Sequence, residues 1–427
     1  MAGTNPLARS ADVTRICTIN VKYSSNLGDG VIAECLEYAM RRLDPAMTVD
    51  AIDLAGRRGF GDGLNRSRAR ILTVLGGVPQ PVRRMLIRGL LSGVARVKLR
   101  PGWAEQLRGC DAVVLGGGQL LADADLNFPI KVGSCLGLVS QARLPVAVYG
   151  VGVGGTWSAA GRRIFRAAMA KVDIRAFIVR DGASRQRAQQ EFGHALDCPV
   201  TICPDPAVLV QEAYAVPGRQ PGPVQRIGLC ISHPGVLRLH ADSGQAAVPA
   251  AEFFIGMVRA VVERGLQPVL FTNGAGEDDS YLNGELLPLF ARAGLLNCVT
   301  VAARPRVPRD LVELIASLDA VVAHRLHASI IAYGLRVPHV GLNWDSKVRS
   351  FFAEVERAAF VVEPEDAVPT RVMALLDDAI VEGIDDAIWQ RTIDRSHSSA
   401  VRLLDSLFQP ARAREGAQWR QHVDAAV

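Results

Sequence analysis

Short apolar runs of strand length alternate along the first half of the chain with longer segments in which apolar residues recur at helical spacing. The short runs predict strands at residues 15–21, 48–54, 112–115, 146–151, 176–179 and 200–202. The longer segments predict helices at residues 29–43, 101–108, 159–172 and 184–192. This alternation is typical of a parallel sheet covered by helices.

A second series of the same kind begins after residues 216–223, a stretch rich in proline and glycine. Its strands are predicted at residues 226–231, 267–271, 299–302, 320–323 and 337–342, with a helix at 250–264. We therefore predict an α/β fold with two Rossmann-like domains and a cleft between them, the glycosyltransferase-B-like architecture. The predicted domains are residues 1–215 and 224–363, followed by a helical C-terminal extension, 364–427.

Two histidines and an arginine stand where the predicted strand 320–323 passes into a helix-like segment: His324, Arg325 and His327. Backbone N–H groups at a helix start attract anions, and a fixed guanidinium adds a two-pronged clamp for phosphate or carboxylate. This arrangement predicts an anion site with a titratable group beside it. The alternative is that the histidines only cap and pack the end of the strand.

Further short motifs also follow predicted strands. They are Asn26–Leu27–Gly28–Asp29, Gly116–Gly117–Gly118, Arg180–Asp181, Pro204–Asp205–Pro206 and Asp345–Ser346–Lys347. Together with Arg325–Leu326–His327, and in this order, they resemble the polysaccharide pyruvyl transferase family over residues 14–355. The chain departs from that pattern at Trp344, where the family is expected to have tyrosine.

The resemblance implies an enzyme of polysaccharide biosynthesis. It would transfer a pyruvyl group from phosphoenolpyruvate, its donor substrate, to hydroxyls of a glycan or lipid-linked glycan, forming a ketal without a cofactor or metal. A small trianion needs several fixed cations, and proton transfer near neutral pH is suited to histidine. The resemblance implies that Arg180, Arg325 and His327 are catalytic and that these three bind the donor together with Leu326 and Lys347.

The remaining motif residues are predicted to lie at the acceptor or in the cleft: Asn26, Gly28, Asp29, Gly116, Gly117, Gly118 and His324. For each, a purely structural role stays open. Asparagine and aspartate commonly cap helices, and glycines commonly make tight turns. A supporting role is favoured for His324, a surface ion pair remains an alternative for Lys347, and the acidic run 277–279 is predicted to be an exposed loop.

The composition is that of an ordinary two-domain α/β enzyme, with 427 residues, 49% hydrophobic residues and a net charge of +5. We expect no membrane span and no signal peptide. None of the eight cysteines forms a C-x-x-C pair, so the cysteine pattern predicts neither a zinc site nor a disulfide framework. These features favour a cytoplasmic protein, and no metal site is predicted.

One segment, residues 55–100, is strongly basic, with ten arginines and one lysine against a single acid, Asp62. Apolar residues interleave with these charges, so two interpretations stay open. The segment either lies on an anionic membrane, which would place the protein peripherally at its inner face, or is a solvated insertion that covers the sheet. Nucleic acid is not predicted as a partner, because no aromatic residues interleave with the arginines.

Two other functions remain as alternatives. The same architecture would suit a sugar-nucleotide-dependent glycosyltransferase or epimerase, which holds a diphosphate with helix N-termini and a basic residue. A non-catalytic glycan-binding relative is the other. The intact set of Arg180, Arg325 and His327 argues against the latter.

Overall fold

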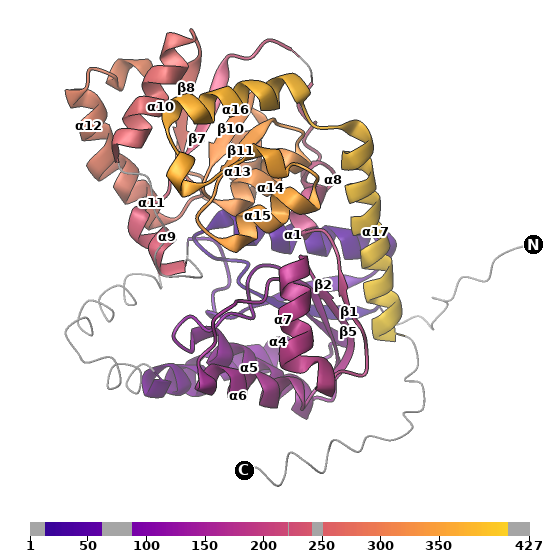
Figure 1. The fold of residues 1–427 in the computed structure, drawn as a ribbon. Helices are drawn as coiled ribbons and strands as arrows, with labels where there is room; N and C mark the ends of the chain where they lie inside the picture. The colour runs from indigo at the N-terminus through magenta and orange to yellow at the C-terminus, as the bar shows by residue number, and fades with distance from the viewer. Residues whose placement is uncertain (1–12, 62–87, 221, 241–250, 409–427) are drawn as a thin grey trace, which may run out of the picture.

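The computed structural model describes residues 13–61, 88–220, 222–240 and 251–408, which form two α/β domains (Figure 1). Each domain is built on a six-stranded sheet, and all of its strand pairs are parallel. The predicted α/β fold with two parallel sheets is confirmed.

The first sheet has the order β2 (Thr48–Asp53), β1 (Arg15–Asn20), β3 (Ala112–Gly116), β4 (Pro145–Val151), β5 (Asp173–Val179) and β6 (Val200–Ile202). Its helices are α1 (Leu27–Leu43), α4 (Arg100–Gln106), α5 (Asn127–Gln141), α6 (Ala159–Met169) and α7 (Gly182–Phe192). The chain order changes direction between β1 and β3. Loops leave in opposite directions at such a point, and a crevice forms at the carboxyl edge.

The second sheet has the order β12 (Val361–Val362), β11 (His339–Leu342), β10 (Ala320–Ala323), β7 (Arg226–Cys230), β8 (Gln267–Phe271) and β9 (Thr300–Val301). Its helices include α9 (Pro234–His240), α10 (Ala251–Glu263), α11 (Gly276–Tyr281), α12 (Leu287–Arg292), α13 (Pro308–Ala316), α14 (Leu326–Gly334), α15 (Ser346–Glu354) and α16 (Pro369–Glu382). All four residues of β10 are buried, because the strand lies between β7 and β11. Here the direction changes between β7 and β10, which places β10 at the crevice.

Several elements differ from the prediction at their ends or were not predicted. Strand 299–302 is reduced to Thr300–Val301, and strand 337–342 begins at His339. The two-residue β12 is too short to leave a pattern in the sequence. Helix α5 was not predicted, although its buried residues Val132, Cys135, Leu136 and Val139 recur at helical spacing.

Two helices join the domains. Helix α1 lies between them in Figure 1, and its residues Leu27, Val31, Ile32 and Cys35 belong to the same buried cluster as the core of the second domain. Helix α17 (Asp386–Phe408) runs along both domains, and its last leucines, Leu403, Leu404 and Leu407, pack on the first sheet. The relative placement of the domains therefore rests on shared apolar packing.

Candidate active site

The His-Arg-Leu-His motif stands at the boundary of the two domains. Strand β10 ends at Ala323, Arg325 is the N-cap residue of α14, and Leu326 begins the helix. His327 therefore lies in the first turn of α14, where backbone N–H groups have no partner within the helix. The motif thus brings the imidazole of His327 and the start of a helix to the carboxyl edge of the second sheet.

His327 packs directly against the start of α1. A Cβ atom built on Gly28 would lie 2.3 Å from the Cβ of His327, so only glycine fits there. The Nδ1 atom of His327 lies 4.0 Å from Oδ1 of Asp29, and its Nε2 atom is buried without a hydrogen-bond partner in the described part of the chain. The structure thus brings Gly28, Asp29 and His327 together at the boundary of the two domains.

The electrostatic environment keeps the imidazole of His327 neutral. Burial lowers its pKa to about 3, and the positive charges of Arg180, Lys347 and Arg325 act in the same direction. Burial raises the pKa of Asp29 to about 6, although a hydrogen bond from Ser24 and nearby arginines oppose this shift. A neutral imidazole beside a carboxyl that titrates near pH 6 can exchange protons with a substrate.

Arg325 is already paired inside the second domain. Its Nε and Nη2 atoms donate to Oδ2 of Asp278 at 3.1 and 2.6 Å, and the Oδ1 atom of Asp278 accepts from the backbone N–H of His233. Residues 277–279 lie in α11, so the prediction of a loop there is wrong, and the side chain of Asp278 is fully buried, so the prediction of exposure is wrong for this residue. Because one edge of the guanidinium is occupied, an anion can reach Arg325 only at its remaining N–H groups.

Arg180 comes from the first domain, directly after β5, and is 8% exposed. Its nearest carboxylates are those of Asp181, 3.5 Å from Nε, and Asp205, 3.8 Å from Nη1, both beyond close hydrogen-bond distance. Each carboxylate also caps a turn, accepting from the backbone N–H of Ser184 or Ala207. The two carboxylates thus balance the charge of the guanidinium, and its N–H groups remain available as donors to a ligand.

Gly152 makes room for this guanidinium, because a Cβ atom there would lie 2.8 Å from Nη2 of Arg180. Gly152 could not be selected from the sequence, because its glycine-rich neighbourhood, residues 152–155, follows β4 and lacks a recognised spacing.

Lys347 lies at the start of α15 and reaches across to the first domain. Its Nζ atom lies 3.2 Å from Oδ2 of Asp345, 3.4 Å from Oε1 of Gln119 and 4.2 Å from the centre of the Trp344 ring. The indole Nε1 of Trp344 donates to the carbonyl of His324 at 2.5 Å. With 16% of its side chain exposed, Lys347 belongs to the boundary between the domains, and Gln119, which the sequence did not single out, is its partner there.

An open pocket lies between the domains beside these residues. Its volume is about 340 Å³ when the solvent at its mouth is included. Arg180 and Lys347 are its two cationic lining residues, and Leu326 lines it from α14. The other lining residues are Asp181, Pro204, Asp205 and Val208 from the first domain, and Ile330, Phe351, Glu354 and Val355 from the second. Neither His327 nor Arg325 lines this pocket, although both lie beside Leu326 in the chain.

The three glycines after β3 have different roles. Cβ atoms on Gly116 and Gly117 would lie 2.6 and 2.5 Å from side chains of α1, so these two glycines allow the helix to approach the strand. Gly118 has a φ of +71°, and a Cβ atom built on it would lie 3.8 Å from Oδ1 of Asp29. Of the three, Gly118 is therefore the one that opens toward the cleft.

Asn26 and His324 also lie near this region. The side chain of Asn26 makes no capping hydrogen bond at the start of α1, and its Oδ1 atom is buried without a partner in residues that the structure describes. His324 is 2% exposed and packs edge-on against Phe253 and Phe254, and burial lowers its pKa to about 3. His324 therefore sits in the core of the second domain, next to the site.

Comparison with solved structures supports the fold. A putative UDP-N-acetylglucosamine 2-epimerase from Listeria monocytogenes matches with a TM-score of 0.51 and 11% identity, covering 93% of this chain and 96% of that one. The spinosyn forosaminyltransferase SpnP matches with a TM-score of 0.50 and 15% identity, covering 93% of this chain and all of that one. At such identities the likeness concerns the fold alone.

A comparison with curated protein sequences gave no match. The family model for polysaccharide pyruvyl transferases, in contrast, matches residues 26–346, which is more than half of the chain. This range begins at Asn26, before Gly28 and Asp29, and ends at Ser346, so it includes Arg180 and the Arg325–Leu326–His327 motif. The chain belongs to the polysaccharide pyruvyl transferase family.

Proposed function

We propose that this pyruvyl transferase uses phosphoenolpyruvate as its donor and that the acceptor is a pair of hydroxyls on a glycan or lipid-linked glycan. The observation that carries the proposal is the set of cations around one neutral imidazole. Arg180, Lys347 and Arg325 all act on the pKa of His327, and two of them line the pocket between the domains. A small trianion requires fixed positive charges of this kind.

The transfer requires one proton at carbon and two hydroxyl additions. A proton added to C3 of the donor makes a methyl group and leaves an oxocarbenium-like centre at C2. One hydroxyl adds to C2 and loses its proton, the bond from C2 to the phosphate oxygen breaks, and the second hydroxyl then adds and loses its proton. Of the two hydroxyl protons, one replaces that given to C3 and the other leaves with phosphate, so no further reactant is needed.

We assign this proton transfer to His327, because its neutral ring can accept a proton and its Nε2 atom has no partner in the described part of the chain. Arg180 and Lys347 hold the phosphate and carboxylate, with the free end of Arg325 and with Leu326 as an apolar wall. The second domain, residues 224–363, supplies most of the donor site. We further propose that the acceptor binds on the first domain, residues 1–215, at Asn26, Asp29 and Gly118, and that His324 supports the site from the core.

The donor assignment is tested by calorimetry with phosphoenolpyruvate. Loss of a charge-assisted contact costs about 1.5–3 kcal/mol, so Arg180→Ala should weaken donor binding by about 10- to 100-fold. Arg325→Lys should not restore what Arg325→Ala loses, because an ammonium cannot replace the guanidinium. Arg349→Ala is the control, since this arginine of α15 is 64% exposed and pairs with Glu363. Parental donor affinity in both alanine variants would refute the assignment.

The catalytic assignment is tested by turnover, followed as phosphate release with a panel of lipid-linked sugars. General acid–base catalysis is worth about 10²–10⁴-fold, so His327→Asn should lose turnover by about this factor and keep most of its donor affinity. Near-parental turnover with weakened donor binding would make His327 a phosphate ligand instead. Stabilisation by a UDP-sugar in place of phosphoenolpyruvate would favour the sugar-nucleotide alternative, and stabilisation by polymer alone the non-catalytic one.

We also propose that the protein docks peripherally on the anionic inner face of a membrane. Residues 62–87 of the predicted basic segment lie outside the described residues, but residues 88–100 are helical. Leu90, Val94 and Val97 are 45, 37 and 77% exposed there, and exposed Arg88, Arg96 and Lys98 stand among them. Apolar residues among basic ones suit an anionic lipid surface. Among the helices that the structure describes, none is long and apolar enough to cross a membrane.

Sedimentation with liposomes tests this docking. The parent should pellet with vesicles rich in phosphatidylserine at low salt and be released as the salt concentration rises. Val97→Ser should weaken pelleting, whereas Val381→Ser, at a valine of α16 that is 88% exposed, should not. Equal pelleting with neutral and acidic vesicles would refute the electrostatic part of the proposal.

A further inference from the structure

A second polar cluster lies at the carboxyl ends of β1 and β2, on the first domain. Its centre is Asp53, whose side chain is fully buried. The Asp53 carboxylate accepts from the backbone N–H of Tyr23 at 3.0 Å, from that of Ala55 at 2.7 Å and from Nε of Arg57 at 3.1 Å. Gly56, with a φ of +73°, makes the tight turn that brings Arg57 back to Asp53. The loop after β1 and the loop after β2 are thus both bound to the Asp53 carboxylate.

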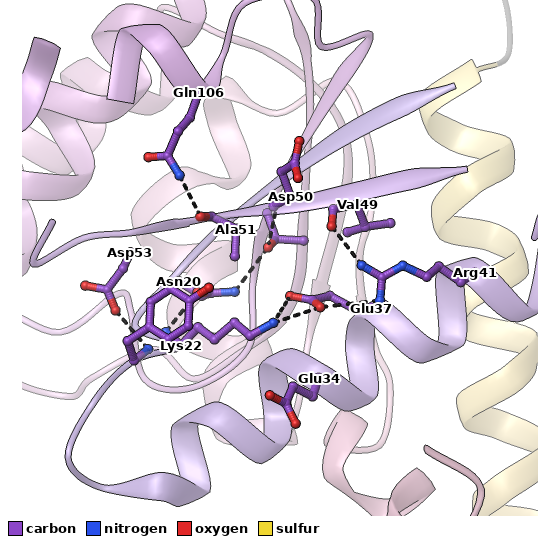
Figure 2. A network of polar contacts seen from close by, with 12 residues as sticks. Asn20, Lys22, Glu34, Glu37, Arg41, Val49, Asp50, Ala51, Asp53 and Gln106 are labelled. Carbon is purple, nitrogen blue, oxygen red and sulfur yellow. Dashed lines mark hydrogen bonds and ion pairs between the residues drawn. The ribbon is translucent and has the colours of Figure 1, made fainter. Parts of the chain in front are cut away.

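Lys22, in the same cluster, has a full set of charge partners. Figure 2 shows its ammonium group against the carboxylate of Glu37, with Nζ 2.8 and 2.9 Å from the two oxygens. Glu37 is 6% exposed and also lies 3.5 Å from Arg41. This pair is a closed structural contact, so Lys22 is not available to a ligand.

Arg57 differs from Lys22. Its side chain is only 10% exposed, and its Nε atom is bound to Asp53, but its Nη1 and Nη2 atoms make no hydrogen bond or ion pair with any residue that the structure describes. Arg57 is half-buried, and neither Nη atom is among the buried polar atoms that lack a partner, so both reach solvent. Asp53 holds the base of the side chain, and the two-pronged end remains available.

The loop that carries Arg57 reaches the start of α1, since a Cβ atom built on Gly30 would lie 3.0 Å from Phe60, and His327 packs on Gly28 one half-turn earlier. The charge of Arg57 lowers the pKa of Asp29 against the effect of burial, and Asp29 is the residue 4.0 Å from His327. An anion held by Arg57 would therefore lie on the first domain near the start of α1, the helix end that His327 contacts.

An aromatic pair borders this space. The rings of Tyr23 and Phe60 meet edge to face, with their centres 5.1 Å apart, and both residues are half-buried. A Cβ atom on Gly30 would lie 3.0 Å from Phe60 and 2.7 Å from Pro308 of the second domain. The pair is thus fixed at the domain boundary, and aromatic rings offer an apolar surface to the C–H face of a sugar ring.

We propose that Arg57 binds an anionic group of the acceptor, a phosphate or a carboxylate, while Tyr23 and Phe60 contact the sugar ring that is pyruvylated beside His327. This inference rests on the proposed function and adds that the acceptor is negatively charged near the reacting hydroxyls. A phosphate would come from a lipid-diphosphate carrier, and a carboxylate from an acidic sugar in the glycan.

The test compares three probes by calorimetry on the full chain: a short-prenol diphosphate-linked galactose, a methyl galacturonoside and methyl galactoside. We expect at least one charged probe to bind the parent about 10- to 100-fold more tightly than the neutral one. Arg57→Gln should abolish this preference, leave methyl galactoside unchanged and leave phosphoenolpyruvate affinity at the parental value. Preference for the first probe identifies phosphate, and preference for the second identifies carboxylate.

Arg58→Gln is the matched control. This neighbour carries the same charge, but its side chain is 71% exposed and pairs with Glu105 on the outside of the fold. If Arg57→Gln proves unstable, Arg57→Lys keeps the ion pair with Asp53 and should still lose most of the preference. The proposal is overturned if the parent binds all three probes equally, or if Arg57 and Arg58 variants behave alike. Failure of the proposed function would appear separately, as a parent that does not bind phosphoenolpyruvate.

Discussion

Donor binding should protonate His327, and this can be measured directly. The free protein holds its pKa at about 3 through burial and three nearby cations. One uncompensated negative charge about 4 Å away contributes about 4 kcal/mol at an effective dielectric constant of about 20, which is about three pKa units. Bound phosphoenolpyruvate should therefore raise the pKa of His327 from about 3 to about 6. At pH 6 the complex would then take up about half a proton at this residue.

The assay is isothermal titration of phosphoenolpyruvate at pH 6 in buffers with different ionisation enthalpies, which reports the number of protons taken up. Because a proton favours the complex, the contribution of His327 should tighten donor binding by about tenfold between pH 8 and pH 5. Proton changes on the phosphate itself occur equally in His327→Asn, so the difference between the two proteins isolates the imidazole. Asp29 is a second titrating group, and its pKa of about 6 would also rise when the donor binds. Asp29→Asn removes its contribution from the proton count.

The reasoning would be refuted by identical proton counts in the parent and in His327→Asn at pH 6. That result would mean that the donor does not come close to His327. Proton uptake that disappears in Asp29→Asn and persists in His327→Asn would move the proton-transfer role to the carboxyl group.

Three further outcomes follow from the packing. Gly28→Ala would put a methyl group 2.3 Å from the Cβ of His327, so turnover should fall at least tenfold, whereas Gly284→Ala, with no atom within 4 Å of the added Cβ, should not change it. Asp278→Asn removes a fully buried anionic partner of an arginine and should lower the free energy of unfolding in urea by about 3–5 kcal/mol. His339 is fully buried with a pKa lowered to about 3, so the unfolded state binds more protons between that value and about pH 6.5. Its contribution to the free energy of unfolding should fall by up to about 1.4 kcal/mol per unit as the pH drops through this window, and His339→Asn should remove that slope.

The sequence was sufficient for those parts of the fold in which local pattern and tertiary position agree. Strand 320–323 was predicted with its observed ends, because four apolar residues stand between polar ones and the strand is buried on both faces. Helix α17 shows the limit of pattern. The sequence predicts a helical C-terminal extension, but what the helix covers depends on where the chain returns. Ile393 and Ala400 of α17 belong to the core of the second domain, whereas Leu403, Leu404 and Leu407 pack on the first sheet.

In the candidate site, too, local pattern predicts some features, and others depend on tertiary position. Motifs close to strand ends could be located, because carboxyl ends of parallel strands share one edge of a sheet. Contacts between distant residues could not, since no spacing relates Arg325 to Asp278 or Lys347 to Gln119. Arg57 was counted only as one charge in a basic segment, because whether an arginine is exposed or buried at a cleft is decided by tertiary packing.

The packing of α1 fixes the two halves of the proposed site relative to each other. His327 comes from the second domain and fits against Gly28 of the first, while Arg180 of the first domain faces Leu326 of the second across the pocket. A displacement of one domain by a few ångströms would separate these groups. Catalysis by fixed charges depends on the charges being in place beforehand. Burial of an apolar side chain of α1 contributes about 1.5–3 kcal/mol, and several such residues lie in the core of the second domain. Opening the cleft would expose them, so the packing of α1 holds the cations and the imidazole of the proposed donor site in place.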